Sequence, residues 1–174
     1  MPTSILDILD SAVKIGLGAL ISGVATYSVT RLRYSQEAKQ KISTRKREII
    51  EDAAEAIEKF NEFSHECSHR IFAVVKGIEE PTELHDAAKG LSKGLSYITK
   101  SIANIQLLGE EAIVKKLYAL KETIVQQYNY VNNCGSKDRS CCDIKKYNDL
   151  VDLISNRKEE VLQELSKSYL KDMS

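Results

Sequence analysis

Several residue types are scarce in this chain of 174 residues, and their scarcity narrows the range of possible folds. The sequence contains no tryptophan, two prolines and eight glycines. Glycine and proline are the strongest breakers of regular structure, so few positions are available for turns. Apolar residues recur at helical spacing along most of the chain, and no stretch requires a β-strand to explain it. The sequence therefore predicts an all-α fold with long helices and few connections.

Common catalytic motifs are missing as well. We find no glycine-rich phosphate loop, no nucleophile elbow and no serine–histidine–acid grouping on a plausible scaffold. The net charge is zero, but residues 1–30 carry −1, residues 31–47 carry +6 and the remainder carries −5. An acidic body without the aromatic platforms of single-strand binders argues against nucleic acid as a partner. We expect no enzymatic activity, no cofactor and no nucleic-acid binding.

One long run near the N-terminus has no charge at all. Residues 15–30 are uncharged, and a span of about 20 residues is available over residues 11–30 if Lys14 extends toward the lipid headgroups. Its strongly apolar residues contribute roughly −2 to −4 kcal/mol to membrane insertion. We predict a single transmembrane helix. A buried core helix and a cleaved signal peptide are the alternatives, although a signal peptide carries its positive charge before the apolar run.

Basic residues cluster directly after this run. Cytoplasmic flanks of membrane helices collect positive charge, so the cluster predicts an inner (plasma) membrane protein with its N-terminus outside and the bulk of the chain in the cytoplasm. It also favours contact with anionic lipid headgroups, at about 1 kcal/mol per close residue. We call this cluster the basic collar, and it consists of Arg31, Arg33, Lys39, Lys41, Arg45, Lys46 and Arg47.

Small residues within the apolar run alternate at intervals of four and three. This spacing puts them on one face of a helix, where they let helix backbones approach closely in lipid. We expect the helix to self-associate and the protein to form a homo-oligomer, although small residues are also simply frequent in membrane helices. The small face comprises Ala12, Gly16, Ala19, Gly23, Thr26 and Thr30.

Four narrow apolar stripes follow in the rest of the chain. They lie between Ile42 and Ile78, Leu84 and Ile105, Ile113 and Val131, and Ile144 and Tyr169. Breaks are expected at Glu79–Thr82, at Leu108–Glu110 and over a polar loop from Asn132 to Ser140. One stripe per helix with short connections is typical of an antiparallel four-helix bundle. A pair of long hairpins that completes its core only as a dimer is the alternative.

The expected organisation has three parts. Residues 1–33 form a short amphipathic turn and the transmembrane anchor, and residues 34–48 form a basic helical stalk. Residues 49–174 form the cytoplasmic helical bundle, whose first helix is long.

The segment His65-Glu66-Cys67-Ser68-His69 matches the H-E-x-x-H motif of zinc peptidases, in which two histidines bind the metal. The short motif carries little specificity, no third histidine follows at the expected spacing, and no strand is available to align a substrate. A metal-dependent hydrolase is therefore the least favoured function. A non-catalytic metal site would use His65 and His69 with His85 from the next helix.

Cysteines flank the connection before the last helix. Cys134, Cys141 and Cys142 lack the paired C-x-x-C spacing of a zinc knot. In a cytoplasmic body they should be reduced thiols, whereas in an oxidising compartment Cys134 and Cys141 could form a disulfide.

Two functions from different classes fit these observations. The first is a membrane-anchored helical bundle that self-associates and presents helix surfaces to an unknown protein partner, as a scaffold, sensor or adaptor. The second is a holin-like or toxin-like protein, in which the glycine-rich helix assembles and permeabilises the bilayer. Membrane lipid is a partner in both.

Overall fold

The computed structural model describes residues 5–136 and 142–171, with side chains from residue 13 onward. This part of the chain forms the helices α1 (Ile5–Val75), α2 (Leu84–Leu107), α3 (Glu111–Gly135) and α4 (Ile144–Lys171), and the short 3₁₀ helix η1 (Pro81–Glu83). It contains no β-strand. The predicted all-α helical bundle with a long first helix is confirmed.

The chain divides into two compact units, Met1–Thr44 and Arg45–Ser174. In the described residues of the first unit, the only element is the N-terminal part of α1. The second unit contains the rest of α1, together with η1, α2, α3 and α4, and we call it the bundle.

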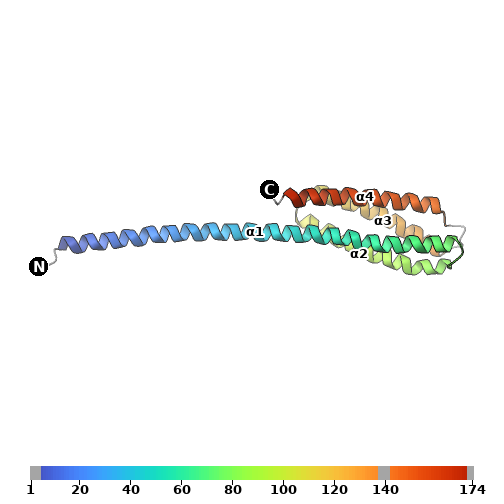
Figure 1. The fold of residues 1–174 in the computed structure, drawn as a ribbon, viewed down its shortest axis with the longest axis horizontal. Helices are drawn as coiled ribbons and strands as arrows, with labels where there is room; N and C mark the ends of the chain where they lie inside the picture. Colours follow the sequence, from blue (N-terminus) through green and yellow to red (C-terminus); the bar gives the residue numbers. More distant parts are fainter. Residues whose placement is uncertain (1–4, 137–141, 172–174) are drawn as a thin grey trace. The chain divides into compact units, whose positions relative to one another are not determined.

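The four helices of the bundle lie side by side, each beside two others (Figure 1). Helix α3 packs against both α2 and α4. Helix α1 completes the ring, because Lys158 of α4 donates a 3.1 Å hydrogen bond to Asn61 and Phe63 of α1 lies against Gly90 of α2. The core between the helices consists of the predicted stripes, with fully buried side chains such as Ile57, Leu91, Leu117 and Val161.

Two glycines of α2 allow a close approach to α1. A Cβ atom placed on Gly94 would lie 2.8 Å from Cδ2 of Phe60 and 3.3 Å from its Cα. A Cβ on Gly90 would lie 3.2 Å from the ring of Phe63. The absent side chains therefore make room for two phenylalanine rings at this contact, and shape complementarity of this kind defines a well-packed core.

The stripe predicted for the first helix is too long at both ends. Ile42 is 71% exposed because it precedes the bundle, and core burial begins at Ile49. At the other end α1 stops at Val75, since Gly77 takes a φ of 75° that turns the chain, and Ile78 is 74% exposed. The predicted break at residues 79–82 is therefore preceded by this earlier turn.

The connections after α2 and after α3 agree with the breaks predicted from the sequence to different degrees. The tight turn at Leu108–Glu110 is present, with Gly109 at a φ of 71°. The predicted polar loop from Asn132 is wrong over its first residues, because α3 continues to Gly135, which is buried. A Cβ on Gly135 would lie 3.3 Å from the backbone oxygen of Pro81, so this glycine serves helix packing rather than a loop.

Candidate functional site

The apolar run of α1 is exposed within the single chain. The exposed fractions of its large apolar side chains range from 52% at Val13 to 73% at Ile15. Of the helices in the described residues, one is long and apolar enough to cross a membrane, as judged by length and composition. A core helix of a soluble protein passes the same test, but such a helix would be mostly buried. Here no part of the apolar stretch that passes the test is buried. The expectation of a core helix therefore does not fit the run.

The small face lies open along this part of α1. A Cβ atom on Gly16, Gly18 or Gly23 would meet no other atom within 4 Å. These glycines therefore differ from Gly90 and Gly94, which serve packing inside the bundle. Ala19 and Thr26 are exposed as well, and the side chain of Ala12 lies outside the described residues.

The basic collar is divided between the two units. Arg31, Arg33, Lys39 and Lys41 are exposed in the N-terminal unit. The other three belong to the bundle, where Lys46 forms a 2.8 Å ion pair with Glu110 and the guanidinium of Arg47 lies 5.9 Å from the ring centre of Tyr169. Arg45 forms a 2.9 Å ion pair with Glu48.

The carboxylate of Glu110 joins three helices at this end of the bundle. It lies directly before α3, accepts a 3.0 Å hydrogen bond from Ser168 of α4 and pairs with Lys46 of α1. The hydrogen bond from Lys46 is the main cause that lowers the pKa of Glu110, with the Ser168 hydroxyl adding to it against partial burial. The sequence does not indicate this junction, since the three residues lie far apart along the chain.

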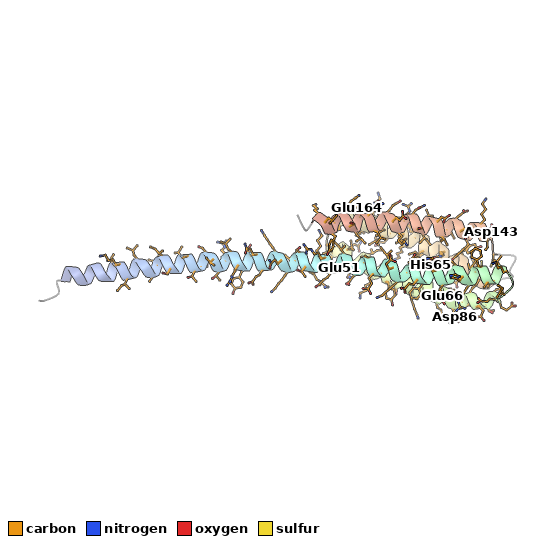
Figure 2. The ribbon with its side chains drawn as sticks, in the orientation of Figure 1. Glu51, His65, Glu66, Asp86, Asp143 and Glu164 are labelled. Carbon is orange, nitrogen blue, oxygen red and sulfur yellow. The ribbon has the colours of Figure 1, made fainter. Side chains whose placement is uncertain are left out.

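The H-E-x-x-H segment lies on α1, with His65, His69 and also His85 of α2 exposed to solvent. Cys67 of the same segment is fully buried in the core of the bundle. Figure 2 labels His65 and Glu66 along α1. Glu66 forms a 3.4 Å ion pair with Arg70. Within the described residues, no group of three histidine, cysteine or acidic side chains is arranged to hold a metal ion.

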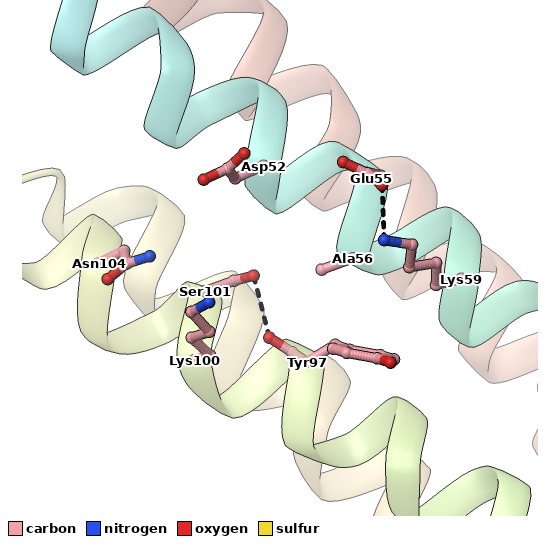
Figure 3. Close-up of a pocket in the computed structure, with 8 residues that line it drawn as sticks. All are labelled: Asp52, Glu55, Ala56, Lys59, Tyr97, Lys100, Ser101 and Asn104. Atoms are coloured by element: carbon pink, nitrogen blue, oxygen red, sulfur yellow. Dashed lines mark hydrogen bonds and ion pairs between the residues drawn. The ribbon is translucent and has the colours of Figure 1, made fainter.

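An open groove of about 220 Å³ lies between α1 and α2 (Figure 3). Lys59 forms a 2.5 Å ion pair with Glu55, and its ammonium lies 5.7 Å from the ring centre of Tyr97. The hydrogen bond between the pair lowers the pKa of Glu55 and raises the pKa of Lys59. Each charge is therefore held by its neighbour in the ionised form, which suits a solvated helix contact better than acid–base catalysis.

A buried polar network that the sequence pattern does not indicate crosses the core. The fully buried amide of Gln127 on α3 donates to the hydroxyl of Ser64 at 3.0 Å and to the hydroxyl of Tyr147 at 3.1 Å. Ser68 donates to the backbone oxygen of Ser64 at 2.9 Å, so the Tyr147 hydroxyl donates to Ser68 at 3.1 Å. The network links α1, α3 and α4. Gln127 lies three residues after Ile124 and four before Val131. This spacing places it on the apolar face of α3 and is the one sign of burial that the sequence carries.

Three cysteines are described, and none is in a disulfide. Cys67 and Cys134 are buried, Cys142 is half-buried, and Cys141 lies outside the described residues. Burial raises the pKa of the Cys67 thiol to about 11, partly offset by the Tyr147 hydroxyl. Comparison with protein-family models, with curated proteins and with solved structures finds no match to this chain.

Proposed function

We propose that this protein is a single-pass membrane protein whose helical bundle acts by interaction, as a scaffold, sensor or adaptor for a protein partner. The observation that carries the proposal is the uncharged, exposed apolar run of α1 followed by the basic collar. Water would be in contact with this run in the isolated chain, and transfer into lipid removes that unfavourable contact. The charge asymmetry supports an inner-membrane orientation with the bundle in the cytoplasm.

Fractionation of cells that express the full chain tests the anchor. We expect the protein in the membrane pellet, resistant to alkaline extraction and released by detergent. Leu20→Arg introduces a charge into the run at a cost of about 2.5–3.5 kcal/mol, comparable with the whole insertion free energy, and should move the protein to the soluble fraction. Ile42→Arg is the matched control, since Ile42 and Leu20 are 71% and 69% exposed on the same helix. A wild-type chain that is soluble without detergent would overturn the proposal.

Protease accessibility tests the orientation. Protease added to inverted membrane vesicles should digest the bundle, whereas protease added to intact spheroplasts should leave it protected. The opposite pattern would place the bundle outside the cytoplasm and contradict the expected topology.

We further propose that the small face mediates self-association in the membrane. Crosslinking in membranes should yield oligomers, and Gly16→Leu with Gly23→Leu should abolish them because bulky side chains keep the backbones apart. Val13→Leu with Val24→Leu adds volume away from the small face and should preserve the oligomers. A membrane-potential dye in the same cells distinguishes this proposal from the holin-like alternative. The alternative predicts loss of membrane potential on expression of the wild type.

The proposal assigns no catalytic activity to the chain. Its support is the ion pairing within the open groove between α1 and α2 and the exposure of the three histidines to solvent. Metal analysis of the purified protein, compared with His65→Ala and His69→Ala variants, tests this assignment. Stoichiometric metal that is lost in both variants would contradict it.

A further inference from the structure

The junction of α3 and α4 brings two cysteines toward one tyrosine. Cys134 is 1% exposed and lies one helical turn after Tyr130, on the same face of α3. The Tyr130 hydroxyl donates a 2.7 Å hydrogen bond to the backbone oxygen of Asp143, the residue that follows Cys142. This bond holds the chain at Cys142 against the last turns of α3, on the face that carries Cys134.

The pKa of the Tyr130 hydroxyl is raised in these surroundings. Burial is the largest cause that raises the pKa of Tyr130, and the thiols of Cys134 and Cys142 raise it further. The geometric link between the two cysteines is the bond from Tyr130 to Asp143, which brings the residue next to Cys142 to the face of α3 that carries Cys134. Cys142 is half-buried and packs against the core, so part of this residue is open to solvent.

Cys67 differs from Cys142, the half-buried thiol that would meet an oxidant first. The side chain of Cys67 is fully buried within α1, and its pKa of about 11 leaves very little thiolate at neutral pH. Thiol–disulfide exchange requires a thiolate with access to its target. Cys67 is therefore an internal reference that should resist oxidation.

We propose that Cys134 and Cys142 form a reversible disulfide that closes the connection between α3 and α4. The oxidant is a small disulfide such as oxidised glutathione. The Cys142 thiolate attacks it and releases one glutathione thiolate, and the Cys134 thiolate then displaces the second glutathione. Two protein thiols are thereby oxidised, one glutathione disulfide is reduced to two thiols, and the two protons pass to the departing thiolates.

The consequence of this bond depends on the compartment. If the bundle is cytoplasmic, as the proposed function has it, the thiols are reduced at rest and the disulfide is a response to oxidation. The chemistry itself does not depend on the anchor. From the sequence, Cys134 and Cys141 are a candidate pair in an oxidising compartment, and Cys141 lies outside the described residues. The bond from Tyr130 to Asp143 points to Cys142 instead.

The test uses the full chain in detergent micelles, incubated with oxidised glutathione and mapped by mass spectrometry after proteolysis. We expect one Cys134–Cys142 crosslink, a mass loss of about 2 Da from two hydrogens, and a melting temperature raised on the order of 5 °C because the bond restricts the unfolded chain. Cys141→Ser should retain both changes, and Cys142→Ser should lose both. A Cys134–Cys141 crosslink, a melting shift that survives Cys142→Ser, or the absence of an intramolecular disulfide would overturn the proposal.

Discussion

The two parts of α1 differ in how far they bury the same type of side chain. Val24 and Val74 both lie on α1, yet Val24 is 59% exposed and Val74 is fully buried. In the bundle, partners on α2, α3 and α4 remove apolar side chains from water, and the apolar residues keep to one stripe. The apolar run lies in a unit that has no other described element, and none of its residues from Ile15 to Thr30 is charged. Tertiary partners, rather than residue type or helix propensity, therefore decide burial. An exposed apolar stretch of this size is the feature on which the proposed membrane anchor rests.

The largest expected effect compares two leucines. Leu117→Ala removes a fully buried side chain from the bundle core and should lower the free energy of unfolding by about 2–5 kcal/mol. Leu17→Ala removes a side chain that is 56% exposed in the apolar run and should leave unfolding of the bundle unchanged. Urea unfolding in mild detergent, followed by circular dichroism, measures both. Equal losses would mean that the run packs into the same cooperative unit as the bundle.

A comparison of two glycines should give the next largest effect. Gly94→Ala places a methyl group within 2.8 Å of the Phe60 ring, and overpacking of this kind costs about 1–3 kcal/mol. Gly23→Ala enters open space and should not change the thermal unfolding of the bundle. If Gly94→Ala proves as stable as the wild type, α1 and α2 do not approach as closely as the structure shows.

The polar network distinguishes the interior of the bundle from the apolar run. Tyr147→Phe leaves the buried amide of Gln127 with one acceptor fewer and should cost about 1–2 kcal/mol. Tyr27→Phe, at a position 67% exposed in the run, is the control and should leave the bundle unaffected. The measurement is chemical unfolding of each purified variant, and a neutral Tyr147→Phe would show that the network adds little to stability.

The smallest effect concerns Glu110, close to the point where α1 enters the bundle. Its pKa is lowered below 4.5 by the hydrogen bond from Lys46, so its contribution is complete above pH 4.5 and is lost as the pH falls through the lower folded-state value. Glu110→Gln should cost about 0.5–1 kcal/mol at pH 7, the size of a partly exposed ion pair. Melting curves between pH 7 and pH 3 should converge for wild type and variant, and a constant gap would exclude the charge as the cause.

The sequence predicted the fold largely because helical periodicity is a local property. Leu91, Ile98 and Ile105 follow one another at intervals of two helical turns on α2, so their shared face follows from the chain alone, and all three are buried. The ends of elements were less predictable. Ile78 continues the spacing of the stripe, but the positive φ at Gly77 ends α1 before it, and a single glycine in a pattern gives no clear sign of its conformation.

The contacts that cross the bundle could not be predicted in the same way. Gln127 fits the stripe by spacing, yet a glutamine there indicates a solvated position until Ser64 and Tyr147 are known to lie beside it. In the sequence the basic collar is a single feature, because its residues all lie between Arg31 and Arg47. The structure separates it, since Lys46 meets Glu110 and Arg47 meets Tyr169, residues more than sixty positions away.

This separation sets a practical limit on how the bundle can be isolated. A soluble fragment that starts at residue 49, where core burial begins, would discard two cations that hold α3 and α4 at that end. A fragment that starts at Arg45 retains them and omits the apolar run. Truncation at these two positions should therefore yield proteins of different stability, even though the shorter one lacks no residue of the apolar core.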